Sequence, residues 1–185
     1  GQTCVAGSRI LAHASVIDDL VERVRAVAAA VVLGDPLDPA TTMGPLVSDA
    51  QLARVRGYVE GAPADGAELI FGGRCGGEAV FGAGSPFAGG SWVAVVMPFT
   101  DDDEAVALAN GTAFGLAAGV WTTDLKRAHR MVRDLDAGSV WVNAYRRIHW
   151  ALPFGGFGDS GFGKDSGMES VLENTRIKTA WIDLA

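Results

Sequence analysis

The sequence predicts an α/β protein in which a mostly parallel sheet is flanked by helices. Short apolar runs, typical of buried strands, alternate along the chain with longer segments whose apolar residues recur every three or four positions, the period of a helix. Gly, Pro and Asp separate these segments, so helices connect successive strands, as in parallel sheets. With 185 residues, 49% of them apolar, the chain is long enough for one domain with a substantial core, and we expect one domain over residues 1–185.

Two helices are predicted in the first third of the chain. Apolar residues at helical spacing over residues 16–31 follow Ser15, which we expect to cap the first helix. Ser48 with Gln51 three residues later has the spacing of a capping box, and the apolar positions that follow predict a helix to about residue 63.

The rest of the chain continues the alternation. The glycine-rich residues 72–90 and 155–167 are expected to be loops. A final β-rich run at residues 176–184 suits a sheet edge or a partner chain. The predicted strands are residues 9–12, 68–71, 92–99, 116–121 and 139–143, and the predicted helices are residues 101–110, 124–135 and 167–174.

Charge and composition exclude several classes of function. The net charge of −7 would repel a nucleic acid, so we expect none as a partner. The longest apolar stretch, residues 26–33, is far shorter than the roughly 20 residues that span a bilayer, which predicts a soluble, cytoplasmic protein with no membrane partner. The three histidines and two cysteines are not at metal-ligand spacing, so we predict no metal.

Cys4 is the candidate nucleophile. It precedes Val5, Ala6 and Gly7, which are compatible with a helix start, and helix-start amides favour a thiolate and can donate to an oxyanion. The residues alone leave open the alternative of an inert buried cysteine, which is more common. Cys75, in a glycine-rich loop, is interpreted as incidental.

Two other patterns have structural alternatives. Gly156, Gly158 and Gly161 match a dinucleotide fingerprint, with Asp183 about where a ribose ligand would stand, but residues 144–155 separate them from the preceding strand. A small nucleotide-binding unit is therefore the weaker alternative. The acidic residues 101–104 suit a helix N-terminus better than a metal or a catalytic carboxylate pair.

The order of short motifs along the chain resembles the aldehyde dehydrogenase family. Each motif is weak alone, but together they cover nearly the whole chain in the order and spacing of that family. The motifs are Gly1-Gln2-Thr3-Cys4, Gly34-Asp35-Pro36, Gly44-Pro45-Leu46-Val47, Asp103-Glu104-Ala105-Val106, Phe114-Gly115-Leu116, Gly138-Ser139-Val140-Trp141-Val142-Asn143, Pro153-Phe154-Gly155-Gly156 and Ser160-Gly161-Phe162-Gly163.

The resemblance implies a function for several residues. Cys4 would attack an aldehyde carbonyl, with NAD or NADP as hydride acceptor, and Phe154 and Ile148 would line the aldehyde site. Residues 176–185 would form an oligomerisation strand, which implies a homo-oligomer. The 155–163 glycines would form a structural turn beside the active site.

The sequence also departs from the family. We find no match to the N-terminal dinucleotide-binding domain, to the general-base glutamate or to the oxyanion asparagine, and roughly a score of residues are missing between residues 73 and 92, where the family holds the nicotinamide. We therefore expect a catalytic portion, inactive alone, that associates with a missing N-terminal portion. The alternative is a degenerate, non-catalytic remnant that serves as a folded or oligomerising module.

Overall fold

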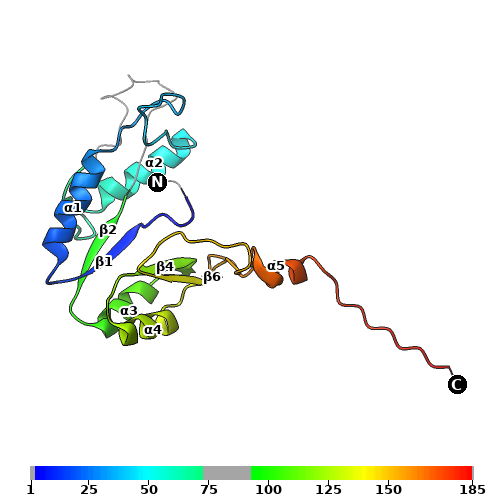
Figure 1. Ribbon diagram of the computed structural model, residues 1–185. Helices are drawn as coiled ribbons and strands as arrows, with labels where there is room; N and C mark the ends of the chain where they lie inside the picture. The colour runs from blue at the N-terminus through cyan, green and yellow to red at the C-terminus, as the bar shows by residue number, and fades with distance from the viewer. Residues whose placement is uncertain (1–2, 73–92, 185) are drawn as a thin grey trace. The chain divides into compact units, whose positions relative to one another are not determined.

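A computed structural model describes residues 3–72 and 93–184. The contacts of the chain define two compact units, Gly1–Thr100 and Asp101–Ala185, and each holds one pair of parallel strands (Figure 1). The longest helices described have 13 residues each, and no described helix is long and apolar enough to cross a bilayer.

In the first unit, strands β1 (Arg9–His13) and β2 (Val95–Phe99) are parallel. Helices α1 (Ile17–Ala29) and α2 (Asp49–Gly61) lie between them in the sequence, and α1 contacts β1 (Figure 1). Ala12 of β1, 4% exposed, belongs to the small core of this unit.

The two helix starts of this unit differ from each other. Ser48 caps α2 as predicted, because its hydroxyl accepts the amide of Gln51 at 3.2 Å. The prediction for Ser15 is wrong: the N-cap of α1 is Val16, which has no accepting side-chain group, and the Ser15 hydroxyl instead bonds Nδ1 of His13 at 2.8 Å.

In the second unit, β4 (Ala117–Val120), α4 (Leu125–Asp134) and β5 (Ser139–Val142) form a βαβ arrangement with the strands in parallel register. Ala128 and Met131 of α4, 8% and 6% exposed, form its core. The remaining elements are α3 (Asp102–Asn110), β3 (Phe114–Gly115), its antiparallel partner β6 (Phe157–Gly158), and α5 (Gly167–Glu173).

The structure confirms the predicted α/β class with parallel strands and flanking helices. The strands of the described residues form three separate pairs. The predicted strand at residues 68–71 is wrong: these residues are exposed, and no described strand pairs with their backbone. Residues 176–184 form no strand and are exposed, and most of the predicted loop at residues 72–90 lies outside the described residues.

Candidate active site

Cys4 lies in a turn that leads into β1, which we call the cysteine turn (residues 3–8). The amide of Ala6 donates to the carbonyl of Thr3 at 3.0 Å. Val5 is 6% exposed whereas Cys4 is exposed, so the backbone is anchored while the thiol faces solvent. The expected helix start is wrong, because the chain makes one turn and then extends into β1. A row of helix-start amides is therefore not formed at Cys4.

Ile148 and Phe154 lie on one segment of the second unit, the β5 loop (residues 143–154). Ile148 is 59% exposed. Phe154 is half-buried, and its backbone exchanges two hydrogen bonds with Asp165, at 2.7 and 2.8 Å. The structure thus brings the two predicted aldehyde-lining residues onto one loop, and it places Cys4 in the other unit.

Asn143 fixes the start of the β5 loop. Its side chain accepts the amide of Thr122 at 2.9 Å and donates to the Thr122 carbonyl at 2.8 Å, which ties the ends of β4 and β5 together. Its φ of 51° lies in the left-handed region, which asparagine tolerates better than most residues. This role of Asn143 was not predicted from the sequence, although asparagine directly after a strand is a signal for such a turn.

Aromatic contacts join the β5 loop to the neighbouring strands. The ring of Tyr145 lies 5.1 Å from that of Trp141 and 6.1 Å from that of Trp121. Burial raises the pKa of Tyr145 above its ordinary value, and the positive charge of Arg146 opposes that shift. The indole of Trp141 donates to the carbonyl of Arg147 at 2.7 Å.

Glycines allow close backbone packing behind this loop. A Cβ on Gly138 would lie 1.8 Å from the carbonyl oxygen of Gly155, so no side chain fits there. Gly158 and Gly161 have φ of 56° and 93°, and they form a turn rather than a strand-to-helix junction, since the next helix begins only at Gly167. The fingerprint glycines therefore do not form a dinucleotide cradle.

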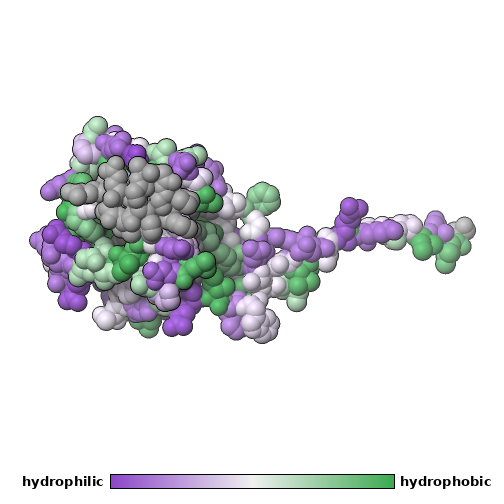
Figure 2. All heavy atoms as spheres, turned by 90° about the horizontal axis from the view of Figure 1, so that it is seen from above, coloured by the Kyte–Doolittle hydropathy of each residue, from purple (hydrophilic) through white to green (hydrophobic). Residues whose placement is uncertain are grey.

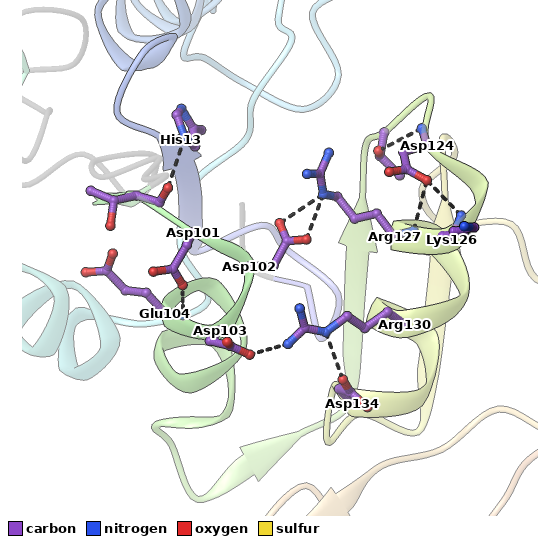
Figure 3. A network of polar contacts seen from close by, with 12 residues as sticks. His13, Asp101, Asp102, Asp103, Glu104, Asp124, Lys126, Arg127, Arg130 and Asp134 are labelled. Carbon is purple, nitrogen blue, oxygen red and sulfur yellow. Dashed lines mark hydrogen bonds and ion pairs between the residues drawn. The ribbon is translucent and has the colours of Figure 1, made fainter.

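The acidic residues at the start of α3 have structural partners (Figure 3). Asp101 caps the helix by accepting the amide of Glu104 at 2.9 Å. Asp102 accepts a hydrogen bond from Nε of Arg127 at 2.9 Å, and Asp103 forms an ion pair with Arg130 of α4. This is the helix-start role that the sequence predicted, together with ion pairs that it did not show.

Arginines of α4 also hold Asp134 at the end of that helix. Hydrogen bonds from Arg133 and from Arg130 keep the pKa of Asp134 below its ordinary value, against partial desolvation. Within residues 3–72 and 93–184, no group of three His, Cys, Asp or Glu side chains is arranged to hold a metal ion.

The model of the "Aldehyde dehydrogenase family" matches residues 1–87 and 92–180. The chain belongs to this family. A betaine aldehyde dehydrogenase of Cereibacter sphaeroides is 40% identical over 201 aligned positions, which cover 100% of the chain and 41% of that protein. Because the chain has 185 residues, at least 16 of those positions (201 less 185) have no residue here. The break between the two matched stretches falls within the segment where the sequence predicted missing residues.

Solved structures of aldehyde dehydrogenases have the same fold as this chain. The NAD⁺ complex of an aldehyde dehydrogenase from Bacillus cereus gives a TM-score of 0.89 at 33% identity, over 100% of this chain and 40% of that one. An NAD-dependent aldehyde dehydrogenase from Sinorhizobium meliloti gives a TM-score of 0.86 at 34% identity, over 96% of this chain and 38% of that one. The chain therefore spans about two fifths of the length of these relatives.

Proposed function

We propose that this chain is the catalytic portion of an NAD(P)-dependent aldehyde dehydrogenase and that Cys4 is its nucleophile. The observation that carries the proposal is the exposed thiol of Cys4 on an anchored turn, within a family match that begins at residue 1. A thiolate in this position can reach a carbonyl carbon without local unfolding. Its addition forms a carbon–sulfur bond, and the carbonyl π electrons move to oxygen to give the thiohemiacetal oxyanion.

The relatives of known structure include an NAD⁺ complex and an NAD-dependent enzyme, so NAD or NADP is the proposed cofactor. When bound, it accepts the hydride that turns an aldehyde into an acyl group. The glycines of residues 156–161 offer it no cradle, because Phe157 and Gly158 form β6 and the next helix begins only at Gly167. We therefore expect the 185-residue chain to transfer acyl groups through Cys4 but to form no NADH by itself.

An acyl-transfer experiment tests the nucleophile without the cofactor. The chain is mixed with p-nitrophenyl acetate, the release of nitrophenolate is followed, and the acetylated peptide is found by mass spectrometry. We expect one acetyl group on Cys4, lost in Cys4→Ser and retained in the matched control Cys75→Ser. Acetylation of Cys75 alone, or of neither cysteine, would overturn the assignment of Cys4.

A second experiment tests the need for further residues. The chain is incubated with an aldehyde and NAD⁺ or NADP⁺, and absorbance of the reduced cofactor is followed. We expect none. Turnover that disappears in Cys4→Ser would support Cys4 as the nucleophile but contradict the proposal that the chain is an incomplete enzyme.

The C-terminal residues favour a second candidate function, that of an oligomerising module. Residues 176–184 extend beyond α5 (Figure 1), and Figure 2 shows apolar side chains gathered at the end of this tail. Ile177, Trp181 and Leu184 are 99%, 92% and 93% exposed, and an extended apolar segment can pair with a strand of another copy. Light scattering should show fewer copies per particle after truncation at Thr175. An unchanged number of copies would exclude the tail as the contact between them.

A further inference from the structure

We propose that the β5 loop binds an oxyanion and that the aldehyde taken by this chain carries a carboxylate or phosphate group besides its carbonyl. The loop is the part of the second unit on which the proposed aldehyde-lining residues lie. The inference about the substrate rests on the proposed function. The oxyanion site itself rests on the charge and the conformation of the loop.

The first observation is charge. Residues 137–158 contain no Asp or Glu, and the β5 loop carries Arg146 and Arg147, in a protein whose net charge is −7. Both arginines are exposed, and neither forms an ion pair in the described part of the chain. The arginines of α4, in contrast, are all paired with aspartates. The β5 loop therefore has two guanidinium groups available for an external anion.

The second observation is backbone strain. Arg146 has a φ of 59°, and it is one of only three residues other than glycine with a positive φ in the described chain. This conformation costs free energy for a residue with a Cβ, so the surroundings must hold it. Asn143 has a positive φ in the same loop. Strain of this kind gathers at ligand-binding segments, where the loop is fixed before the ligand arrives.

The third observation is the frame that fixes the loop. The Trp141 indole holds the Arg147 carbonyl, and the amide of Gly167 holds the Trp150 carbonyl at 2.9 Å. The His149 ring accepts the amide of Ala151 at 3.1 Å. These bonds tie the backbone down while the arginine side chains extend into solvent, so an anion would meet a preformed loop.

The surface beside the arginines suits the carbon skeleton of such a substrate. Trp150, 80% exposed, stacks on His149 at 5.2 Å between ring centroids, and Ile148 is exposed next to them. The carboxylate of Glu169 lies beside Gly167, and that of Glu173 accepts the amide of Lys164. Neither forms an ion pair with Arg146 or Arg147 in the described part of the chain. Exposed apolar side chains that follow two positive charges in the same loop match a small molecule with an apolar body and an anionic end.

The same charges act against a cationic substrate. The Cereibacter sphaeroides relative is named for betaine aldehyde, whose quaternary ammonium group would be repelled by two unpaired guanidinium groups. An aromatic side chain can bind such a cation only where like charges are kept away. We therefore expect this chain to differ from that relative in the charge of the aldehyde that it accepts.

Ligand titration tests the loop without activity or cofactor. The ¹⁵N-labelled 185-residue chain, in a Cys4→Ser background, is titrated at 0.15 M NaCl with succinate, with inorganic phosphate and with choline. The indole and arginine side-chain N–H signals are followed by NMR. We expect a saturable shift of the Trp141 or Trp150 indole with succinate or phosphate and none with choline. The anion that binds more tightly identifies the carboxylate or the phosphate as the substrate group.

Matched double variants separate a specific site from bulk charge. Arg146→Gln with Arg147→Gln should weaken anion binding about tenfold or more, because two charge-assisted hydrogen bonds are lost. Arg54→Gln with Arg56→Gln removes two exposed arginines of α2, gives the same net charge, and should change the affinity less than about twofold. If the double variant fails to fold, Arg147→Gln alone serves as the test. It leaves the strained Arg146 in place and should also weaken anion binding.

Three results would overturn the assignment: no saturable shift with either anion, binding of choline in its place, or equal losses in the two double variants. Failure of the proposed function is distinguishable, because it is measured by acetylation of Cys4. Anion binding without acetylation would leave the oxyanion site standing and remove the dehydrogenase proposal.

Discussion

The turn that presents Cys4 is held by the buried Val5 and by backbone hydrogen bonds, among them those of Ala6 with Thr3 and of Val95 with Ser8, whereas the β5 loop is also held by a network of side chains. Asn143 and Trp141 bind backbone groups of other segments, and Tyr145 packs between aromatic rings. The difference teaches that the proposed substrate-binding segment is prebuilt within its own unit. The turn that carries the proposed nucleophile relies instead on backbone hydrogen bonds and on the parallel pairing of β1 with β2 that follows it.

A substitution at Gly138 should have the largest effect and would test the rigidity of the second unit. Gly138→Ala places a Cβ against the Gly155 carbonyl, which the backbone must move to avoid, so we expect a loss of about 3 kcal/mol. Gly57→Ala in α2, where nothing lies within 4 Å of the new Cβ, should stabilise by about 0.5–1 kcal/mol. Hydrogen exchange of β4 and β5 amides against β1 and β2 amides measures the contrast. Equal protection in the Gly138 variant and the unchanged chain would show that the second unit tolerates the shift.

Asn143 distinguishes the hydrogen bonds of the β5 loop from its strain. Asn143→Ala loses two bonds to Thr122 and keeps a Cβ at positive φ, so we expect a loss of about 2–3 kcal/mol in urea unfolding. Asn143→Gly loses the same bonds without the strain and should be about 1 kcal/mol more stable than the alanine variant. The reverse order would show that φ is not strained in the folded protein.

Ser48 gives a smaller effect in the first unit. Ser48→Ala removes the cap of α2 and should cost about 1 kcal/mol. The matched change Ser15→Ala should cost less, because Ser15 does not cap α1 and its bond to His13 is exposed to solvent. Urea unfolding followed by circular dichroism measures both, and a larger loss at Ser15 would contradict the observed helix start.

The smallest effect is the pH dependence of the ion pairs of α4. Hydrogen bonds from Arg133 and Arg130 keep the pKa of Asp134 below its ordinary value in the folded chain, so its contribution to stability is present above that ordinary value and is lost as the pH falls through the folded pKa. Asp134→Asn should therefore lower the Tm by about 1–3 °C at pH 7 and by less near pH 2. A decrease of the same size at both pH values would assign the effect to packing rather than charge.

Local signals in the sequence were sufficient for most of the elements. The Ser48 cap and the acidic start of α3 follow from side chains that bond amides within three residues, and α1 and α4 follow from their apolar period. The predicted strand at residues 68–71 failed because a strand requires a distant partner, which composition does not reveal. Periodicity likewise did not predict the hydrogen bonds of Asn143 with Thr122 or the absence of ion pairs at Arg146 and Arg147 among the described residues. Both depend on which residues of other segments lie nearby.

The candidate site divides in the same way. Cys4 is exposed, so the alternative of a buried cysteine is wrong, and the helix start expected there is a turn because the chain enters β1 at once. The roles of Cys4, Ile148 and Phe154 remain predictions, since they concern ligands rather than contacts within the chain.

The arrangement of the β5 loop has a consequence for protein engineering. Its backbone is fixed at Asn143 and Phe154 at its two ends and at the carbonyls of Arg147 and Trp150 between them, while the side chains of residues 146–150 are exposed. Exposed side chains such as that of Arg147 can thus be replaced to change the charge of the loop while its backbone keeps its hydrogen bonds.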